Sequence, residues 1–385
     1  MVHMLVKNYN LKKLGNLIEK DLLEILLASF IIFLLSAIIH CPFIEPNYYS
    51  DIVSIWYREE IRNEGIPYFQ VKFEYPQLAG LITYISVIFG KGLFKYYLLM
   101  CLHLLFFTIG SVFLTYKIIK LKNYEMNRIY RYFLLTPSML IFLVYNYDIL
   151  VVFFVLLAIF FYFKEKFSLA GFSIGFGIIS KLAPVFLIPI FLLEIKDFRK
   201  KLSFLIPAII VPFIANLLPA IYNYPIWFET YKHHMEWGLE NSWLVFLFIN
   251  PSSWNTAKLL SELLLIYGAF KVYVWKEENI IEKCFAMLSV FLLANYVYTP
   301  QMNIWLLPFF VFSNKDFYLF YPFELLNACI ILFWFITPNP TQAFSTTQYF
   351  ATTRSTLLFI ILLNRISLSK TIINKLLRGK GDVYS

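Results

Sequence analysis

The chain has 385 residues, of which 60% are hydrophobic and only 15% are charged, and its mean hydropathy is +0.67. This composition cannot cover the surface of water-soluble domains, and it excludes collagen-like, coiled-coil and disordered proteins as well. The formal net charge of +9 is therefore considered first as a signal of membrane topology and not of nucleic-acid binding.

Apolar segments recur from residue 22 to residue 372, and a helix of about 20 apolar residues crosses a hydrocarbon layer of about 30 Å. We predict an all-α, polytopic protein that forms a single transmembrane domain over residues 1–385, with about twelve membrane-spanning helices. These helices are expected near residues 21–41, 92–116, 128–145, 148–163, 168–180, 182–195, 202–221, 257–275, 282–298, 301–313, 317–336 and 355–372.

Lysine and arginine residues predict the orientation of the chain. An even number of crossings places both termini on one side, and most of the Lys and Arg residues fall on that side. Both termini are therefore expected in the cytoplasm, with two long outer segments at residues 42–91 and 222–256. The Lys- and Ile-rich chain without a glycosylation sequon favours a prokaryotic plasma membrane, with the endoplasmic reticulum as the alternative.

Two apolar segments do not fit full spans. A crossing at Leu78–Phe89 would reverse every later loop, so we expect a juxtamembrane helix in the outer interface. Residues 167–195 are too few for two full spans, so two short, tilted helices are expected to meet near Lys181. The glycines Gly171 and Gly175 predict close helix packing and not a phosphate loop.

Two aspartates are predicted to be catalytic. Asp51 follows the first predicted span, and Asp148 lies at the outer junction of the third and fourth. A carboxylate in a partly dehydrated place is costly unless it is paired or used, and it can take a proton from a sugar hydroxyl. Asp51 and Asp148 are therefore expected to share one pocket, although helix capping is an alternative role for each.

Further polar and aromatic residues are candidate substrate ligands on the same face. Lys181 is a lone cation in a long apolar stretch, so it is expected to face a cavity filled with phosphate or water, or else to snorkel to the headgroups. The other candidates are Arg58, Tyr68, Lys72, Glu74, Tyr75, Trp237, Glu240, Gln301 and Asn303. The alternatives are an interfacial belt for tryptophan, and helix capping beside Pro300 for Gln301 and Asn303.

No metal site is predicted. The adjacent His233 and His234 do not share a helical face, so His-His-x-Glu is a weak ligand pattern. The sequence requires no cofactor, and the need for a divalent metal ion stays open.

The order of these motifs resembles the GT-C superfamily of polytopic glycosyltransferases, above all its mannosyltransferase-like members. The resemblance covers residues 20–310, and the last two predicted spans match nothing. The common Pro-Pro of the family is Pro76-Gln77 here, and no large soluble C-terminal domain follows. The matching pieces are Tyr49-Ser50-Asp51, Gly65-Ile66-Pro67-Tyr68, Glu74-Tyr75-Pro76-Gln77-Leu78, Asn146-Tyr147-Asp148, Ser180-Lys181, and Thr299-Pro300-Gln301 with Trp305 and Pro308.

The resemblance implies an inverting hexosyltransferase, with mannose as the expected sugar. The implied donor is a polyprenyl-phosphate sugar, and the acceptor is a lipid- or glycan-linked hydroxyl on the outer membrane face. Asp51 is implied as the base, Asp148 as a second acid and Lys181 as a partner of the donor phosphate. Membrane lipids are expected partners and nucleic acids are not.

Two other kinds of protein fit the composition. A multispanning transporter or lipid flippase would show repeated halves and polar residues at the midplane, whereas the polar residues here gather at one face. A structural subunit of a larger membrane complex would need neither aspartate.

Overall fold

The computed structural model describes residues 2–276, 279–313 and 318–366. Within these ranges the chain forms helices joined by loops and no β-strand, so the prediction of an all-helical protein is confirmed. The β-bridges found there are two isolated ones, Pro67 with Val71 and Glu240 with Val297. The α-helices are α1 (Val2–Ile39), α2 (Asp51–Trp56), α3 (Glu59–Arg62), α4 (Gln77–Phe89), α5 (Leu93–Lys122), α6 (Pro137–Phe142), α7 (Asp148–Phe163), α8 (Phe167–Ile178), α9 (Ile188–Glu194), α10 (Phe198–Tyr222), α11 (Tyr224–Glu236), α12 (Trp254–Tyr273), α13 (Ile280–Ala294), α14 (Leu307–Val311), α15 (Phe320–Trp334) and α16 (Thr346–Ile366).

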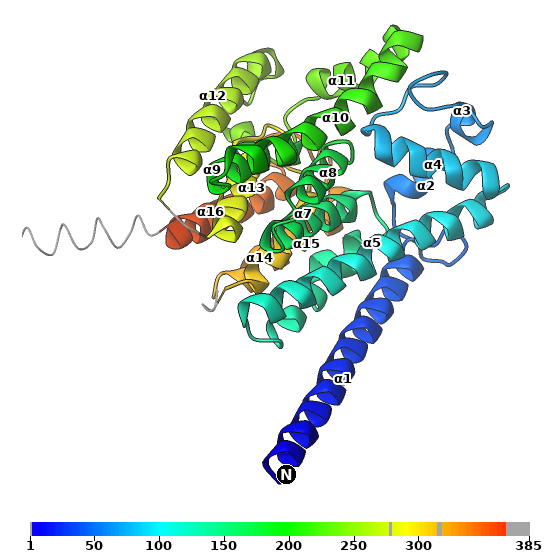
Figure 1. The fold of residues 1–385 in the computed structure, drawn as a ribbon. Coiled ribbons are helices and arrows are strands. Elements are labelled where there is room, and N and C mark those ends of the chain that lie inside the picture. Colours follow the sequence, from blue (N-terminus) through cyan, green and yellow to red (C-terminus); the bar gives the residue numbers. More distant parts are fainter. Residues whose placement is uncertain (1, 277–278, 314–317, 367–385) are drawn as a thin grey trace, which may run out of the picture.

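Three of the described helices are long and apolar enough to cross a membrane, namely the Lys20–Ile39 part of α1, α5 and α10. Figure 1 shows α1 reaching out of the body of the molecule, with α5 packed against its C-terminal part. The predicted spans near 148–163, 168–180, 182–195 and 317–336 correspond to apolar helices of only 10–17 residues. The structure is therefore that of a helical membrane protein, but twelve full crossings are not confirmed.

The centre of the bundle is α7, whose residues are mostly buried and which packs against α5 and α8. Helix α8 also packs against α10, and small residues of α8 form this contact. A Cβ atom at Gly171 would lie 2.0 Å from the carbonyl oxygen of Phe204, and one at Gly175 would lie 2.8 Å from Cβ of Val211. The predicted packing role of these glycines is confirmed, because only a residue without a side chain permits this approach.

Two predicted spans are interrupted by proline. Residues 128–145 divide into the π-helical turn η1 (Tyr130–Leu134) and α6, because Thr136 caps α6 by accepting a hydrogen bond from the Met139 amide at 3.3 Å and Pro137 starts it. Residues 301–313 divide into the 3-10 helix η5 (Pro300–Trp305) and α14, which has Pro308 in its first turn. Proline suits the first turn of a helix and disrupts a helix interior, so each helix restarts there.

Residues 167–195 form two short helical units, as predicted. The first is α8, and the second consists of the 3-10 helix η2 (Ala183–Leu187) followed by α9. The break between them contains Lys181, and Pro184 lies in the first turn of η2. The break leaves the Lys181 side chain free to turn toward α7.

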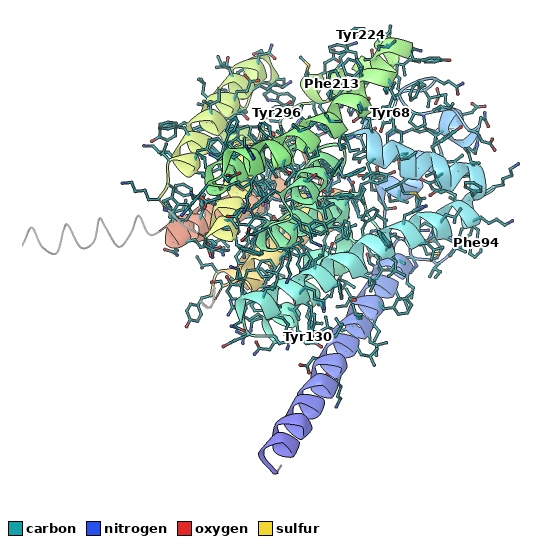
Figure 2. All side chains as sticks on the ribbon, in the orientation of Figure 1. Tyr68, Phe94, Tyr130, Phe213, Tyr224 and Tyr296 are labelled. Atoms are coloured by element: carbon teal, nitrogen blue, oxygen red, sulfur yellow. The ribbon has the colours of Figure 1, made fainter. Side chains whose placement is uncertain are left out.

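The two long loop regions lie at one end of the bundle, here called the loop end. Residues 42–91 carry α2, α3 and the predicted helix at 78–89, which is α4, and residues 222–256 carry α11 with the short helices η3 (Trp243–Phe246) and η4 (Pro251–Ser253). Thr230 of α11 donates to the Phe73 carbonyl at 2.7 Å, so the two regions are bonded together. Figure 2 shows Tyr68 and Tyr224 at this end and Tyr130 at the opposite one.

Candidate active site

Asp51 is the first residue of α2 at the loop end. The preceding Ser50 caps this helix, because its Oγ accepts a hydrogen bond from the Val53 amide at 3.2 Å. The Asp51 amide donates to the Tyr145 carbonyl at 2.9 Å, which ties α2 to the loop before α7. Since Ser50 does the capping, the Asp51 carboxylate is available for other contacts.

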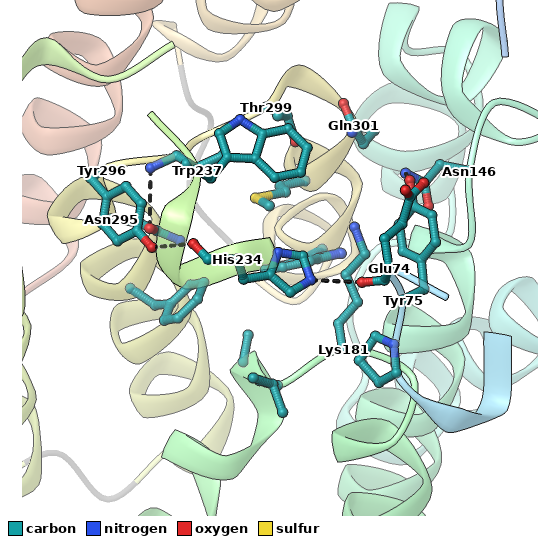
Figure 3. A pocket seen from close by; sticks show the side chains of 17 residues that line it. Glu74, Tyr75, Asn146, Lys181, His234, Trp237, Asn295, Tyr296, Thr299 and Gln301 are labelled. Atoms are coloured by element: carbon teal, nitrogen blue, oxygen red, sulfur yellow. Dashed lines mark hydrogen bonds between the residues drawn. The ribbon is translucent and has the colours of Figure 1, made fainter. Parts of the chain in front are cut away.

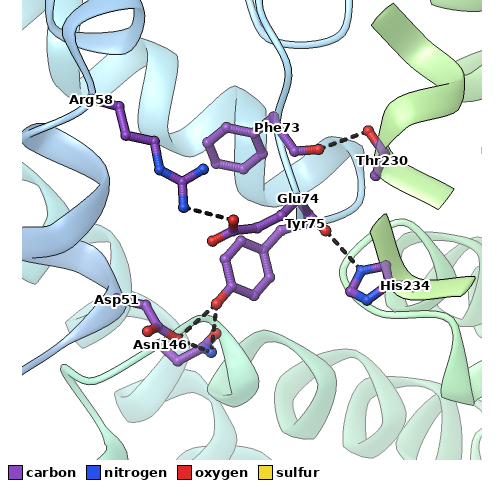
Figure 4. A network of polar contacts seen from close by, with 8 residues as sticks. All are labelled: Asp51, Arg58, Phe73, Glu74, Tyr75, Asn146, Thr230 and His234. Atoms are coloured by element: carbon purple, nitrogen blue, oxygen red, sulfur yellow. Dashed lines mark hydrogen bonds and ion pairs between the residues drawn. The ribbon is translucent and has the colours of Figure 1, made fainter. Parts of the chain in front are cut away.

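The Asp51 carboxylate accepts two hydrogen bonds at Oδ2 (Figure 4). Tyr75 donates its hydroxyl at 2.7 Å and Asn146 donates from Nδ2 at 2.8 Å. The same Nδ2 lies 3.1 Å from the Tyr75 hydroxyl. Three segments distant in sequence therefore meet at one carboxylate oxygen, and neither donor carries a charge that would neutralise it.

Burial raises the pKa of Asp51 above its ordinary value of 3.8, and the neighbouring Glu74 adds to the rise. Hydrogen bonds from Tyr75 and Tyr49 and the charge of Lys181 act in the opposite direction. A carboxylate with a raised pKa holds a proton more strongly than an exposed aspartate does. Asp51 is therefore suited to accept a proton from a hydroxyl group.

Lys181 and Asp148 form a buried ion pair. Nζ lies 2.9 Å from Asp148 Oδ2, and the side chains are 12% and 0% exposed. Nζ also lies 5.6 Å from the ring centre of Tyr75 and 5.8 Å from that of Trp305. Asp148, predicted as a second catalytic acid, has an enclosed carboxylate that is paired with Lys181. Asp148 is placed as the counter-ion of Lys181.

A cavity of about 220 Å³, here called the polar pocket, lies between the two loop regions (Figure 3). In Figure 3 Tyr75, Asn146 and Lys181 lie on one side and Asn295 and Tyr296 on the other. Asp51 does not line it, but Tyr75 and Asn146, which donate to Asp51 Oδ2, do. The lining consists of Glu74, Tyr75, Pro76, Asn146, Lys181, Leu182, Ala183, His234, Trp237, Phe291, Asn295, Tyr296, Val297, Thr299, Gln301, Met302 and Trp305.

Glu74 connects the two loop regions at the edge of the polar pocket. Its Oε2 lies 2.6 Å from Nη2 of Arg58, and its carbonyl oxygen accepts a hydrogen bond from Nε2 of His234 at 2.8 Å (Figure 4). Arg58 is thus already paired with a carboxylate. Among the described residues that line the pocket, Lys181 is the one lysine or arginine.

The side chains of His234 and the adjacent His233 make contacts within the protein. The Nε2 atom of His234 faces a carbonyl oxygen and so carries the hydrogen, and burial lowers the pKa of this imidazole. The ring of His233 lies edge-on to Trp237, with 4.9 Å between centres. No group of three or more His, Cys, Asp or Glu side chains that could hold a metal ion is found in the described part of the chain.

Trp237 lines the pocket and Glu240 supports it. The indole Nε1 donates to Glu240 Oε2 at 2.8 Å, and burial raises the pKa of this carboxyl. The Glu240 amide donates to the Tyr296 carbonyl at 3.0 Å, and the Tyr298 amide donates to the Glu240 carbonyl at 2.9 Å. Glu240, predicted as a substrate ligand, therefore holds Trp237 against residues 296–298.

Tyr68 was predicted as a substrate ligand, but it does not line the pocket and instead supports the residues that do. Its hydroxyl lies 2.7 and 2.8 Å from the carbonyl oxygens of Tyr75 and Pro76, and it accepts a hydrogen bond from the Gly80 amide at 3.1 Å. These contacts use the donor and acceptor capacity of the hydroxyl. Tyr68 therefore fixes the turn that presents Tyr75 to Asp51.

Lys72 and Asn303 lie apart from the pocket lining as well. Lys72 is 70% exposed and pairs with Glu229 at 3.3 Å on the surface. Asn303 is fully buried and donates to Glu324 Oε1 at 3.1 Å. The prediction of these two as ligands does not agree with their positions, because one faces solvent and the other is bonded inside the bundle.

Sequence reasoning left several lining residues out of the predicted site, namely Asn146, His234, Asn295, Tyr296 and Thr299. Asn146 stood in a motif beside Asp148, and its amide was a usable signal. Asn295 and Tyr296 gave no such signal in the sequence, because they fell inside the helix predicted at 282–298. That helix ends at Ala294, and the chain then pairs with Glu240.

A larger cavity of about 960 Å³, here called the apolar groove, lies between α12, α13 and α16. Its lining is mostly apolar and aromatic, with Lys271 and a few hydroxyl groups of α16. Val290 and Leu293 of α13 line this groove, while Phe291 of the same helix lines the polar pocket. One helix therefore borders both spaces.

The fold and the pocket define a helical membrane protein with a polar site at one end of its bundle. Residues 73–300, more than half of the chain, match the family model described as Glycosyltransferase family 87. The chain belongs to this family of GT-C-like membrane glycosyltransferases, and the predicted resemblance to the GT-C superfamily is confirmed. No curated protein and no solved structure gives a significant match.

Proposed function

We propose that this glycosyltransferase transfers a hexose, with mannose as the expected sugar, from a polyprenyl-phosphate donor to an acceptor hydroxyl. The acceptor is linked to a lipid or a glycan and is met at the outer membrane face. Transfer proceeds in one step with inversion at the anomeric carbon. Asp51 is the base and Lys181 receives the phosphate.

The position of Tyr75 between Asp51 and Lys181 is the observation that carries this proposal. Its hydroxyl donates to Asp51 at 2.7 Å, and its ring centre lies 5.6 Å from Lys181 Nζ. One side chain of the pocket wall thus lies between a carboxylate of raised pKa and an ammonium group. A base on one side and a cation on the other are what a displacement with a charged leaving group requires.

The proposed step balances as follows. The acceptor oxygen forms a bond to the anomeric carbon as its proton passes to the Asp51 carboxylate. The bond between the anomeric carbon and the phosphate oxygen breaks, and the lipid phosphate leaves with the electron pair. Lys181 has three N–H donors, and Asp148 takes one of them, so two remain for phosphate oxygens.

The apolar groove supports a lipid-linked donor. A sugar on a polyprenyl phosphate combines an anionic head with a long apolar chain, and α13 borders both the polar pocket and the groove. The family match does not favour the transporter alternative, because the matched family is one of transferases.

The test combines substrate screening with an Asp51→Asn variant. Purified protein in lipid nanodiscs is incubated with radiolabelled polyprenyl-phosphate hexoses and membrane extract, and the labelled product is identified. We expect transfer from polyprenyl-phosphate mannose and a loss of about 100-fold or more in the variant, since general-base catalysis contributes about 10²–10⁴-fold. Transfer should also fall as the pH is lowered through the raised pKa of Asp51, because a protonated carboxyl cannot accept a proton.

Glu59→Gln is the matched control, because Glu59 is an exposed acid of the same loop region. It should transfer sugar at the wild-type rate. Full turnover in Asp51→Asn would remove Asp51 from the mechanism. Transfer from nucleotide sugars alone would contradict the proposed donor.

A further inference from the structure

The C-terminal helix α16 lies outside residues 73–300, the part that matches the family model. It packs against α13 and α15 (Figure 1). One of its residues, Arg354, is fully buried and is among the largest enclosed side chains of the described chain. A buried guanidinium is costly unless its donors are satisfied, so its partners indicate its role.

Arg354 donates hydrogen bonds to three separate segments. Its Nη2 donates to the carbonyl oxygens of Asn241 at 3.0 Å and Tyr298 at 2.8 Å, and its Nη1 donates to Oδ1 of Asn327 at 2.9 Å. The guanidinium carbon also lies 3.5 Å from the ring centre of Tyr298. One side chain thus joins the loop after α11, the segment before η5 and helix α15.

Two of these segments form walls of the polar pocket. Asn241 directly follows Glu240, which holds Trp237, and Tyr298 directly precedes Thr299, which lines the pocket. Asn327 extends the connection, because its Nδ2 donates to the Pro300 carbonyl at 2.9 Å. None of the contacts of Arg354 is to a residue that itself lines the pocket.

We propose that Arg354 is a positioning residue that holds the Trp237 wall and the Thr299–Gln301 wall of the polar pocket in register. The planar guanidinium offers five donors in a fixed fork, so it can fix three acceptors at once. A lysine ammonium is a single point charge on a flexible chain and cannot reproduce this geometry. The inference rests on the proposed function only in taking the polar pocket as the substrate site.

The experiment compares Arg354→Gln and Arg354→Lys with Arg365→Gln in the full chain. Arg365 is a matched control on the same helix, since it is also buried and hydrogen-bonded, to Glu282 at 2.7 and 2.8 Å. Hydrogen exchange is followed by mass spectrometry, and transfer is measured per folded molecule with polyprenyl-phosphate mannose. Folded protein is quantified by size-exclusion chromatography.

Both Arg354 variants should show faster amide exchange in residues 237–241 and 296–301. Their transfer should fall by up to about 100-fold, as expected for misplaced substrate-binding groups. Arg365→Gln should leave the exchange of these segments and the transfer per folded molecule unchanged. Wild-type behaviour in Arg354→Lys would overturn the proposal, because a positive charge alone would then suffice.

A partner variant keeps the proposal testable if the Arg354 variants do not fold. Asn327→Ala removes the hydrogen bonds to the Pro300 carbonyl, to Ser138 and from Arg354 Nη1, but Arg354 keeps its bonds to Asn241 and Tyr298. Exchange at 299–301 should therefore become faster, and by more than exchange at 237–241. Unchanged exchange at both segments would contradict the proposal. Hydrogen exchange tests the positioning role of Arg354 even if the wild type transfers no mannose. Absence of transfer by the wild type would count against the proposed function and not against the role of Arg354.

Discussion

A single ion pair decides how Lys181 can act. Asp148 is fully buried and pairs with Lys181 at 2.9 Å, while its Oδ1 has no hydrogen-bond partner among the described residues. Asp148 therefore depends on Lys181 for its one strong contact. The pair keeps the ammonium beside Tyr75 and Trp305, where the proposed phosphate would lie.

Lys181→Met should destabilise the protein by about 3–5 kcal/mol, because it leaves a buried carboxylate without its counter-ion. The double variant Lys181→Met/Asp148→Leu should regain most of this stability and still transfer no sugar. Thermal unfolding in detergent and the transfer assay separate the two effects. The control Lys232→Met should change stability little, since Lys232 makes only surface ion pairs. Wild-type transfer by the double variant would exclude Lys181 from phosphate binding.

At the scale of elements, prolines and small residues shape the helices around the site. Pro137, Pro184 and Pro300 each stand at the start of a helix that follows a break. Lys181 and Thr299 of the polar pocket lie next to two of these breaks, and Asn146 follows the helix that Pro137 starts. The close packing of α8 on α10 then holds the helix that precedes Lys181.

Gly171→Ala should separate α8 from α10. The added Cβ would lie 2.0 Å from the Phe204 carbonyl oxygen and 2.8 Å from Cγ of Pro207, and backbone cannot yield as a flexible side chain can. We expect a loss of about 1–3 kcal/mol, as for overpacked cores. Thermal unfolding followed by fluorescence-detected chromatography measures it. Phe172→Leu, at a 43% exposed position of the same helix, is the control and should unfold as the wild type does. Equal stability of Gly171→Ala would contradict the packing role.

At the scale of the whole molecule, the two long loop regions share one end of the bundle. Hydrogen bonds from Thr230 to Phe73 and from His234 to Glu74 connect them. Glu165, between α7 and α8, lies beyond the other end of α7 from Asp148. A protein that spans a membrane along α5 and α10 should therefore present the loop regions on one side and Glu165 on the other.

Single cysteines test this arrangement in a background without the four native cysteines. Glu59→Cys and Glu236→Cys should react with a membrane-impermeant maleimide in intact cells. Glu165→Cys should react only after permeabilisation, because the proposed outer face is the loop end. All three wild-type residues are exposed, so access to the reagent is comparable. Reaction of Glu59→Cys and Glu236→Cys from different sides would contradict the shared loop end.

Local sequence was sufficient for much of the fold. The apolar segments at α5, α7 and α10 and the paired short helices around Lys181 were predicted, because hydropathy and proline act over a few residues. The prediction was wrong at residues 282–298, where the helix ends before Asn295. That end is set by pairing with Glu240, a partner distant in the chain.

By itself the sequence determined a helical membrane protein with polar residues collected in two loop regions, since composition and spacing are properties of neighbouring residues. It also placed Asp51 and Lys181 among the candidates. Only the tertiary structure decided that Asp148 neutralises Lys181, that Asn146 and Tyr75 hold Asp51, and that Arg354 joins the walls of the pocket. Each of these contacts joins residues far apart in the chain, so no local pattern specifies them and the packing of the helices does.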